Sequence, residues 1–266
     1  MDSRQRQTVV LLHSSASSPR QWQELVELLR NEFRVVAVEF HGHGMRPDWR
    51  GERAMALADD AALAAPMLEA QGPVHLVGHS YGAAAALKVA SQHPGRIASV
   101  TAYEPVLFRL LFDEPRWQRE AEDVLIVAHA MREELEAARP DRAGRRFVDF
   151  WSGAGAWDSL PPVRQQAVAL RMPSVLRHFD ALFAEPFPRE QMARFGAPML
   201  FLSGAKTVPA ARRIAQSLRA MLPLAVHEEL PDMGHMGPVT HAWQVNARIR
   251  QFLREHSLRE AAVISP

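Results

Sequence analysis

One serine flanked by glycines stands out among the residues that could carry out chemistry. It lies in Gly78-His79-Ser80-Tyr81-Gly82, between the apolar run Val74–Val77 and an alanine-rich stretch. A serine hydroxyl is a weak nucleophile, so an enzyme must expose it, place a base beside it and supply donors for an oxyanion. A sharp strand-to-helix turn helps with all three, and the two glycines remove side chains that would clash there. We predict that Ser80 is a nucleophile; an ordinary turn serine is the alternative.

Four short motifs in a fixed order give the chain a resemblance to the α/β-hydrolase superfamily over nearly its whole length. They are Leu11-Leu12-His13-Ser14-Ser15, Gly42-His43-Gly44, the Gly78–Gly82 turn and Gly234-His235-Met236-Gly237-Pro238. The resemblance implies a mostly parallel sheet of eight strands flanked by helices, with a helical cap inserted after strand six. It also implies hydrolysis through a covalent acyl intermediate.

The resemblance singles out one of the 12 histidines as the general base. The superfamily places its base in a loop after a strand, and His235 lies between glycines after the β-rich run Ala225–Leu230. A surface loop histidine is the alternative. By the same resemblance His13 is structural, and we interpret His79 as packing or as a wall of the pocket. No histidine pair has the helical spacing of a metal site with an acid nearby, so we expect no metal.

The acid of the triad departs from the common superfamily pattern. Relatives read Gly-x-x-Asp after the strand at Met199–Ser203, whereas this chain reads Gly204-Ala205-Lys206-Thr207. Glu104, however, follows the preceding strand, Ile97–Tyr103, and some superfamily members place their acid at that strand end. Because neighbouring strands end at the same edge of the sheet, a longer Glu from one can replace an Asp from the other.

The acid must fix the tautomer of the base and stabilise the imidazolium, which requires a buried and correctly aimed carboxylate. We therefore predict Glu104 as the third catalytic residue. Three alternatives stay open: a Glu104 that only lines the pocket, a dyad without an acid, and Asp232, three residues before the base.

The resemblance also implies which groups form the oxyanion hole. They are the backbone N–H of Tyr81, directly after the nucleophile, and that of Ser15, the second residue after His13. Ser14 stands where relatives commonly have glycine. The hydroxyl of Ser14 or Ser15 is either a further donor or a loop-stabilising group.

Short β-rich runs alternate with helical patterns, which predicts an α/β fold with a mostly parallel sheet. The strands are expected at Val9–Leu12, Arg34–Phe40, Val74–Val77, Ile97–Tyr103, Met199–Ser203 and Ala225–Leu230. Helices are expected over 18–30, 55–71 with a bend at Pro66, 83–92, 209–221 and 241–254. In Ser18-Pro19-Arg20-Gln21, a serine N-cap and a capping-box glutamine would open the first helix.

Residues 106–195 show helical patterns and no clear strand. A segment of this length with amphipathic helices predicts a helical cap, with 1–105 and 196–266 forming the core domain. Its aromatic residues suggest a partly apolar pocket over Ser80, with Phe108 and Trp151 among the walls. Ser14 and Met236 complete the expected substrate pocket.

The composition excludes several classes of function. The 266 residues carry a formal net charge of +1, which gives no electrostatic reason to expect nucleic acid or a membrane as partner. Cysteine is absent from the sequence, which excludes disulfides, thiolate catalysis and zinc–thiolate sites. No apolar run approaches the roughly 18 residues that span a bilayer, and no signal peptide is recognisable. We expect a cytoplasmic protein without a cofactor, either monomer or homodimer.

These features together predict a serine hydrolase that cleaves a carboxylic ester or a related small-molecule acyl compound through Ser80, His235 and Glu104. C–C bond hydrolysis or acyl transfer by the same three groups is the first alternative. A non-catalytic, ligand-binding homologue is the second, because Thr207 stands where relatives have aspartate.

Overall fold

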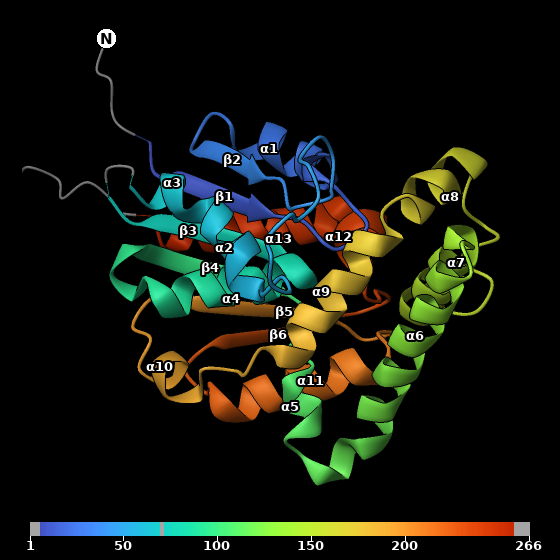
Figure 1. Ribbon diagram of the computed structural model, residues 1–266. Helices are drawn as coiled ribbons and strands as arrows, with labels where there is room; N and C mark the ends of the chain where they lie inside the picture. The colour runs from blue at the N-terminus through green and yellow to red at the C-terminus, as the bar shows by residue number, and fades with distance from the viewer. Residues whose placement is uncertain (1–5, 70–71, 258–266) are drawn as a thin grey trace, which may run out of the picture.

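A parallel sheet of six strands forms the centre of the computed structural model, which describes residues 6–69 and 72–257 (Figure 1). The strand order is β2-β1-β3-β4-β5-β6, and each strand runs parallel to its neighbours. The strands are β1 Thr8–Leu12, β2 Arg34–Val38, β3 Val74–His79, β4 Ile97–Tyr103, β5 Met199–Gly204 and β6 Val226–Leu230. All carboxyl ends of the strands therefore lie at one edge of the sheet.

The expected eight strands are wrong for the described residues, which contain six. Eight was the number implied by the resemblance, whereas the β-rich runs of the sequence number six, and these six form the sheet. The helical insertion accordingly follows β4, the fourth strand of this chain, rather than a sixth. The α/β class, with a parallel sheet flanked by helices, is confirmed.

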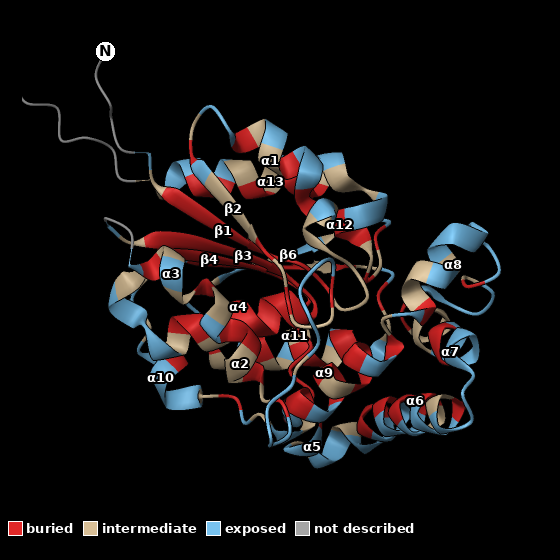
Figure 2. Cartoon of the chain, turned by 45° about the horizontal axis from the view of Figure 1, so that its top comes forward, coloured by how far each residue is buried: buried red, intermediate tan, exposed pale blue. Residues whose placement is uncertain are grey.

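Helices cover both faces of the sheet because side chains alternate along buried parallel strands. Val9 and Leu11 of β1 belong to one apolar core, together with residues of α1 (Gln23–Leu29) and α13 (Ala242–Glu255). Val10 and Leu12 belong to the other, together with residues of α2 (Leu57–Ala61), α4 (Tyr81–Gln92) and α11 (Pro209–Met221). Figure 2 shows the inner strands β1, β3 and β4 buried, whereas the edge strands β2 and β6 are mostly half-buried or exposed; exposed residues lie on the outer sides of the helices.

The segment between β4 and β5 contains helices α5 to α10 and no strand. In Figure 1, α6, α7 and α8 lie to one side of the sheet, and α9 runs back toward its carboxyl edge. The helices are α1 Gln23–Leu29, α2 Leu57–Ala61, α3 Ala65–Leu68, α4 Tyr81–Gln92, α5 Arg109–Phe112, α6 Gln118–Glu136, α7 Pro140–Ser152, α8 Pro162–Ala169, α9 Met172–Ala184, α10 Arg189–Ala193, α11 Pro209–Met221, α12 Gly237–Thr240 and α13 Ala242–Glu255. No helix among the described residues is long and apolar enough to cross a membrane.

Two local expectations in the first third of the chain need correction. Ser18 makes no side-chain cap, and the helix opens with a 3-10 turn, Pro19–Trp22. The side chain of Gln21 turns instead toward the loop after β1, where it accepts hydrogen bonds from Ser14. The single helix expected over 55–71 is divided into α2, a 3-10 turn and α3, because Pro66 has no N–H to continue the helix.

Candidate active site

The residues of the predicted triad meet at the carboxyl edge of the sheet. Ser80 directly follows β3, Glu104 directly follows β4, and His235 lies in the loop after β6. The N–H of Ser80 donates to the carbonyl of Tyr103 at 2.9 Å, and the N–H of Glu104 donates to the carbonyl of Leu202 at 2.9 Å. These bonds extend the sheet by one residue on each strand and so fix where the two side chains start.

The three side chains form a continuous hydrogen-bonded chain. The Ser80 hydroxyl donates to Nε2 of His235 at 2.9 Å, and Nδ1–H of His235 donates to Oε2 of Glu104 at 2.7 Å. Their exposed fractions are 5% for Ser80, 3% for His235 and 2% for Glu104. The carboxylate holds the proton on Nδ1, which leaves Nε2 free to accept the proton of the serine.

Backbone strain marks both the serine and the glutamate. Ser80 has φ 57° and ψ −118°, and Glu104 has φ 43°, a region that non-glycine residues rarely adopt. The turn at Ser80 is possible because Gly78 and Gly82 have no side chains. A Cβ at Gly78 would overlap the backbone at Gly82, and a Cβ at Gly82 would overlap the carbonyl of Leu12.

The carboxylate of Glu104 accepts three hydrogen bonds. Its Oε1 accepts from the N–H of Gly204 at 2.7 Å, and its Oε2 accepts from both Thr207 Oγ1 and His235 Nδ1, each at 2.7 Å. Thr207, the residue that stands where relatives have aspartate, therefore orients the Glu104 carboxylate. Asp232 has an exposed side chain and pairs with Lys206 at 2.7 Å, away from the imidazole.

A second chain of hydrogen bonds, which the sequence did not reveal, reaches the backbone of His235. Gln21 Nε2 donates to His79 Nδ1 at 3.1 Å, and His79 Nε2 donates to the carbonyl of His235 at 2.8 Å. Burial lowers the pKa of His79 well below its ordinary value, so the ring stays neutral and keeps this tautomer. His79 is thus more than the packing or wall residue expected from the sequence, and its place next to Ser80 is the one sequence signal of this role. Tyr103 adds a hydrogen bond to the carbonyl of Gly234 at 2.8 Å.

The loop after β1 lies against the start of α4, where the expected oxyanion donors are found. The His13 ring holds this loop, because its Nδ1–H donates to the Ser14 carbonyl at 2.7 Å and its Nε2 faces the N–H of Phe40 at 3.4 Å. Tyr81 is the first residue of α4, a position whose N–H has no intrahelical acceptor. The N–H of Ser15 likewise donates to no acceptor within the described part of the chain.

The four expected pocket residues occupy different places. The Trp151 ring of α7 stacks on the His235 ring, with centroids 4.1 Å apart and planes 24° from parallel. Phe108 is fully buried behind Trp151, at 6.4 Å between centroids. Ser14 directs its hydroxyl to Gln21 at 2.9 Å, which is a loop-stabilising contact. Met236 is half-buried next to the base.

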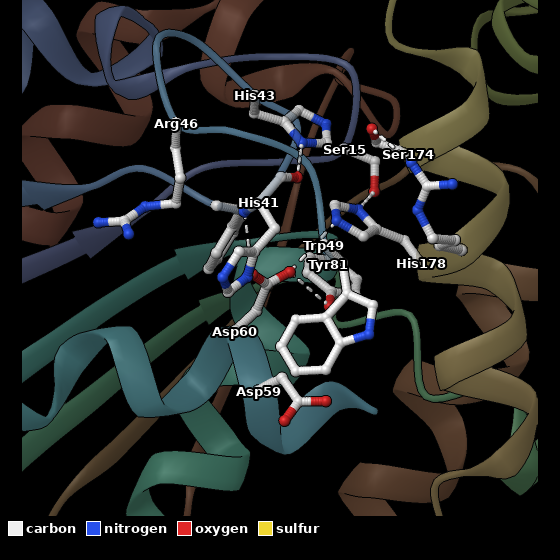
Figure 3. A network of polar contacts seen from close by, with 12 residues as sticks. Ser15, His41, His43, Arg46, Trp49, Asp59, Asp60, Tyr81, Ser174 and His178 are labelled. Carbon is white, nitrogen blue, oxygen red and sulfur yellow. Dashed lines mark hydrogen bonds and ion pairs between the residues drawn. The ribbon is translucent and has the colours of Figure 1, made fainter. Parts of the chain in front are cut away.

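Residues that are far apart in the sequence form a polar network beside Tyr81, which no sequence motif indicates. It contains the buried carboxylate of Asp60 in α2 and the buried ring of His178 in α9 (Figure 3). In the described residues, no group of three or more His, Cys, Asp or Glu side chains is arranged to hold a metal ion.

The alpha/beta hydrolase family model matches residues 9–248, and the chain belongs to this family. Among curated proteins, it is similar to the pimeloyl-[acyl-carrier protein] methyl ester esterase of Methylococcus capsulatus. The two are 27% identical over 261 residues, covering 92% of this chain and 94% of that protein.

Two solved structures share the fold. MGS-M2, an α/β-hydrolase enzyme from a deep-sea metagenome library of the Medee basin, has a TM-score of 0.80 at 15% identity, covering 98% of this chain and 94% of that one. A thermophilic esterase from Thermogutta terrifontis has a TM-score of 0.73 at 21% identity, covering 95% and 92%.

Proposed function

We propose that this chain is a serine esterase that cleaves a small carboxylic ester through an acyl-enzyme on Ser80. The observation that carries the proposal is the hydrogen-bonded chain from Ser80 to His235 to Glu104, with contacts of 2.9 and 2.7 Å. The curated relative is named as an ester-cleaving enzyme, which supports the same bond type for this chain.

In the acylation step, Ser80 Oγ attacks the ester carbonyl carbon while its proton passes to His235 Nε2. The resulting imidazolium is stabilised by the Glu104 carboxylate, which stays ionised throughout. The carbonyl oxygen becomes an oxyanion that the N–H groups of Ser15 and Tyr81 stabilise. The imidazolium then gives its proton to the leaving alcohol, the C–O bond breaks, and the acyl group remains on Ser80.

Water completes the cycle by the same route in reverse. His235 Nε2 takes a proton from a water molecule, whose oxygen attacks the acyl carbon. The tetrahedral intermediate collapses, the bond to Ser80 breaks, and Oγ regains a proton from the imidazolium. The products are a carboxylic acid and an enzyme in its original protonation state.

We further propose that residues 106–195 act as a cap over this site, with 1–105 and 196–266 as the core. Trp151, in van der Waals contact with the His235 ring, would form the wall next to the reacting carbonyl. Phe108 lies in an aromatic cluster with the buried Phe179 and the half-buried Phe183, at 5.2 and 5.4 Å between centroids. The apolar face of Trp151 beside His235 favours an acyl group of apolar character, and the rings behind Trp151 support its position.

Three proteins test the proposal: the wild type, Ser80→Ala and His235→Ala, assayed with a short aryl ester and with a fluorophosphonate probe. The wild type is expected to release the aryl alcohol and to be labelled once per chain. Ser80→Ala should lose labelling, and both variants should lose at least about 10³-fold in kcat. Full activity of Ser80→Ala would reject the mechanism.

Product analysis distinguishes the esterase from its alternatives. With an alcohol acceptor present, a hydrolase yields the free acid, whereas an acyltransferase yields the new ester. A wild-type protein that is neither labelled nor active on any ester tested would favour a ligand-binding homologue instead.

A further inference from the structure

One buried carboxylate connects both expected donors of the oxyanion hole. Asp60, in α2, is fully buried. Its Oδ1 accepts hydrogen bonds from the backbone N–H of His41 at 3.1 Å and from the His41 ring at 2.7 Å. Its Oδ2 faces two further groups, the hydroxyl of Tyr81 and the ring of His178 (Figure 3).

The first branch runs through Tyr81. Its hydroxyl donates to Asp60 Oδ2 at 2.9 Å, so the side chain is held at its far end while its backbone N–H lies at the start of α4. Burial, followed by the nearby charge of Asp60, raises the pKa of Tyr81 well above its ordinary value, so the hydroxyl stays protonated and remains a donor.

The second branch runs through His178 to Ser15. The His178 ring stacks on the Tyr81 ring at 3.6 Å between centroids and 2° between planes. Its Nε2 lies 3.3 Å from Asp60 Oδ2, an electrostatic contact whose geometry is poorer than that of a hydrogen bond. Its Nδ1 lies 2.8 Å from the hydroxyl of Ser15.

Charge decides the direction of the bond to Ser15. Burial alone raises the pKa of Asp60, but the interactions with His178 and His41 outweigh burial and hold that pKa well below its ordinary value. The ionised carboxylate favours the His178 tautomer with its proton on Nε2, and burial lowers the pKa of His178, so the ring stays neutral. Nδ1 then accepts, and the Ser15 hydroxyl donates. The Ser15 hydroxyl therefore donates its proton to His178 and is not available to an oxyanion. The backbone N–H of Ser15 remains as the expected oxyanion donor.

The loop at Ser15 needs such a tie because its backbone is strained. Ala16 has φ 60°, and its N–H donates to His43 Nε2 at 3.1 Å. His43 in turn stacks on His178, with centroids 4.7 Å apart and planes 11° from parallel. The loop is thus held at two consecutive residues by the same pair of stacked histidine rings.

Helix α9 brings His178 to this position through contacts with the core. Ser174 and Arg177, on the same helix, both contact Asp48 in the loop after β2. Gly42 permits the approach, because a side chain there would overlap Ser174. These residues, spaced as neighbours on one helix face, dock α9 beside the oxyanion loop.

We propose that Asp60 is a positioning residue for the oxyanion hole, which it aligns through Tyr81 on one side and through His178 and Ser15 on the other. This inference rests on the proposed esterase function, because it concerns the transition state of that reaction. Asp60 itself touches neither substrate nor triad. Its effect is to keep two backbone donors, one in the loop after β1 and one at the start of α4, at a fixed separation.

Four variants test the proposal while leaving the triad and both backbone donors in place. Tyr81→Phe removes the hydroxyl but keeps the ring, Ser15→Ala removes the bond to His178, and Asp60→Asn removes the charge. Asp59→Asn is the matched control, because Asp59 is the adjacent carboxylate of the same helix but pairs with Arg53.

The measurements are the fraction of labelled Ser80, kcat and KM per labelled site, and the inhibition constant of an aryl trifluoromethyl ketone. That ketone adds to the serine and places an oxyanion in the hole. We expect kcat to fall about 10-fold in each single-branch variant and about 100-fold in Asp60→Asn, which is no more than the roughly 10²- to 10³-fold cost of deleting a donor outright. The inhibition constant should rise by the same factors with KM nearly constant, and the Asp59 variant should match the wild type.

Unchanged kcat per labelled site in Asp60→Asn, or a lower kcat without weaker inhibition by the ketone, would overturn the inference while Ser80-dependent hydrolysis still supported the esterase. A lower labelled fraction as the sole effect would assign Asp60 to folding and overturn it too. A wild type without Ser80-dependent ester cleavage would reject both proposals.

Discussion

Replacing Glu104 with glutamine gives the sharpest test of the acid's role. The substitution keeps the size and shape of the side chain and removes only its charge and one acceptor. In the native site Oε1 accepts from the N–H of Gly204, and Oε2 accepts from Thr207 and from His235 Nδ1.

The backbone at Gly204 decides how the new amide must orient. Its N–H can only donate, so the amide oxygen must take the place of Oε1 and the NH₂ group must face Thr207 and the imidazole. Thr207 can rotate its hydroxyl to accept, but the ring accepts at Nδ1 only if its proton moves to Nε2. In that tautomer Nε2–H donates to Ser80 instead of accepting from it, and the general base is lost.

We therefore expect kcat of Glu104→Gln to fall by about 10⁴-fold, as for a triad forced into the wrong tautomer, with KM nearly unchanged. The assay is steady-state hydrolysis of an aryl ester, corrected for the labelled fraction of Ser80. Thr207→Val keeps the carboxylate but removes one hydrogen bond to it, worth about 1.5 kcal/mol, so it should lose about 10-fold. Asp232→Asn, at an exposed position, is the control. If Glu104→Gln retained more than a tenth of the wild-type kcat, the assignment of the acid would be wrong.

Three further outcomes follow. Gly82→Ala forces a Cβ into the carbonyls of Leu12 and His13, so urea unfolding should show a loss of about 3 kcal/mol; an unchanged midpoint would contradict the close approach. Trp151→Leu removes the ring stacked on His235, so kcat/KM should fall about 3- to 10-fold, whereas an unaltered value would place Trp151 outside the site. Burial lowers the pKa of His75 from 6.5 to about 4, so between these values the unfolded chain binds a proton that the folded chain excludes. Acidification from pH 7 to pH 5 should thus cost about 2 kcal/mol of stability through this residue, and His75→Leu should show a correspondingly flatter pH dependence of urea unfolding.

The sequence predicts the sheet and the meeting of the triad for a simple reason. The six strands follow from the period of apolar residues, and their parallel arrangement brings the strand ends to one edge. The selection of His235 and Glu104 as partners of Ser80 rests in addition on the resemblance to the superfamily. Ser80 and Glu104 each follow a β-rich run, so their closeness follows from strand order alone. The number of strands was wrong where it came from the resemblance and right where it came from the residues.

The parts that the sequence does not predict are contacts between distant side chains. Nothing local distinguishes Asp60, which is buried among two histidines and a tyrosine, from Asp59, which pairs with an arginine at the surface. His178 lies 163 positions from the serine that it contacts. In the sequence, Thr207 stands where relatives have an aspartate and suggests a missing triad residue. Only the structure shows that its hydroxyl donates a hydrogen bond to Glu104.

Trp151 and His178 both belong to the helical segment between β4 and β5, yet each contacts a group at the catalytic edge of the sheet. Exchange of this segment to change substrate preference, in evolution or by design, would therefore also replace Trp151 and His178. We expect kcat to change together with the substrate preference. A chimera that carries a foreign segment onto this sheet should bind new esters but turn them over slowly, until a ring able to reach the oxyanion loop is grafted with it.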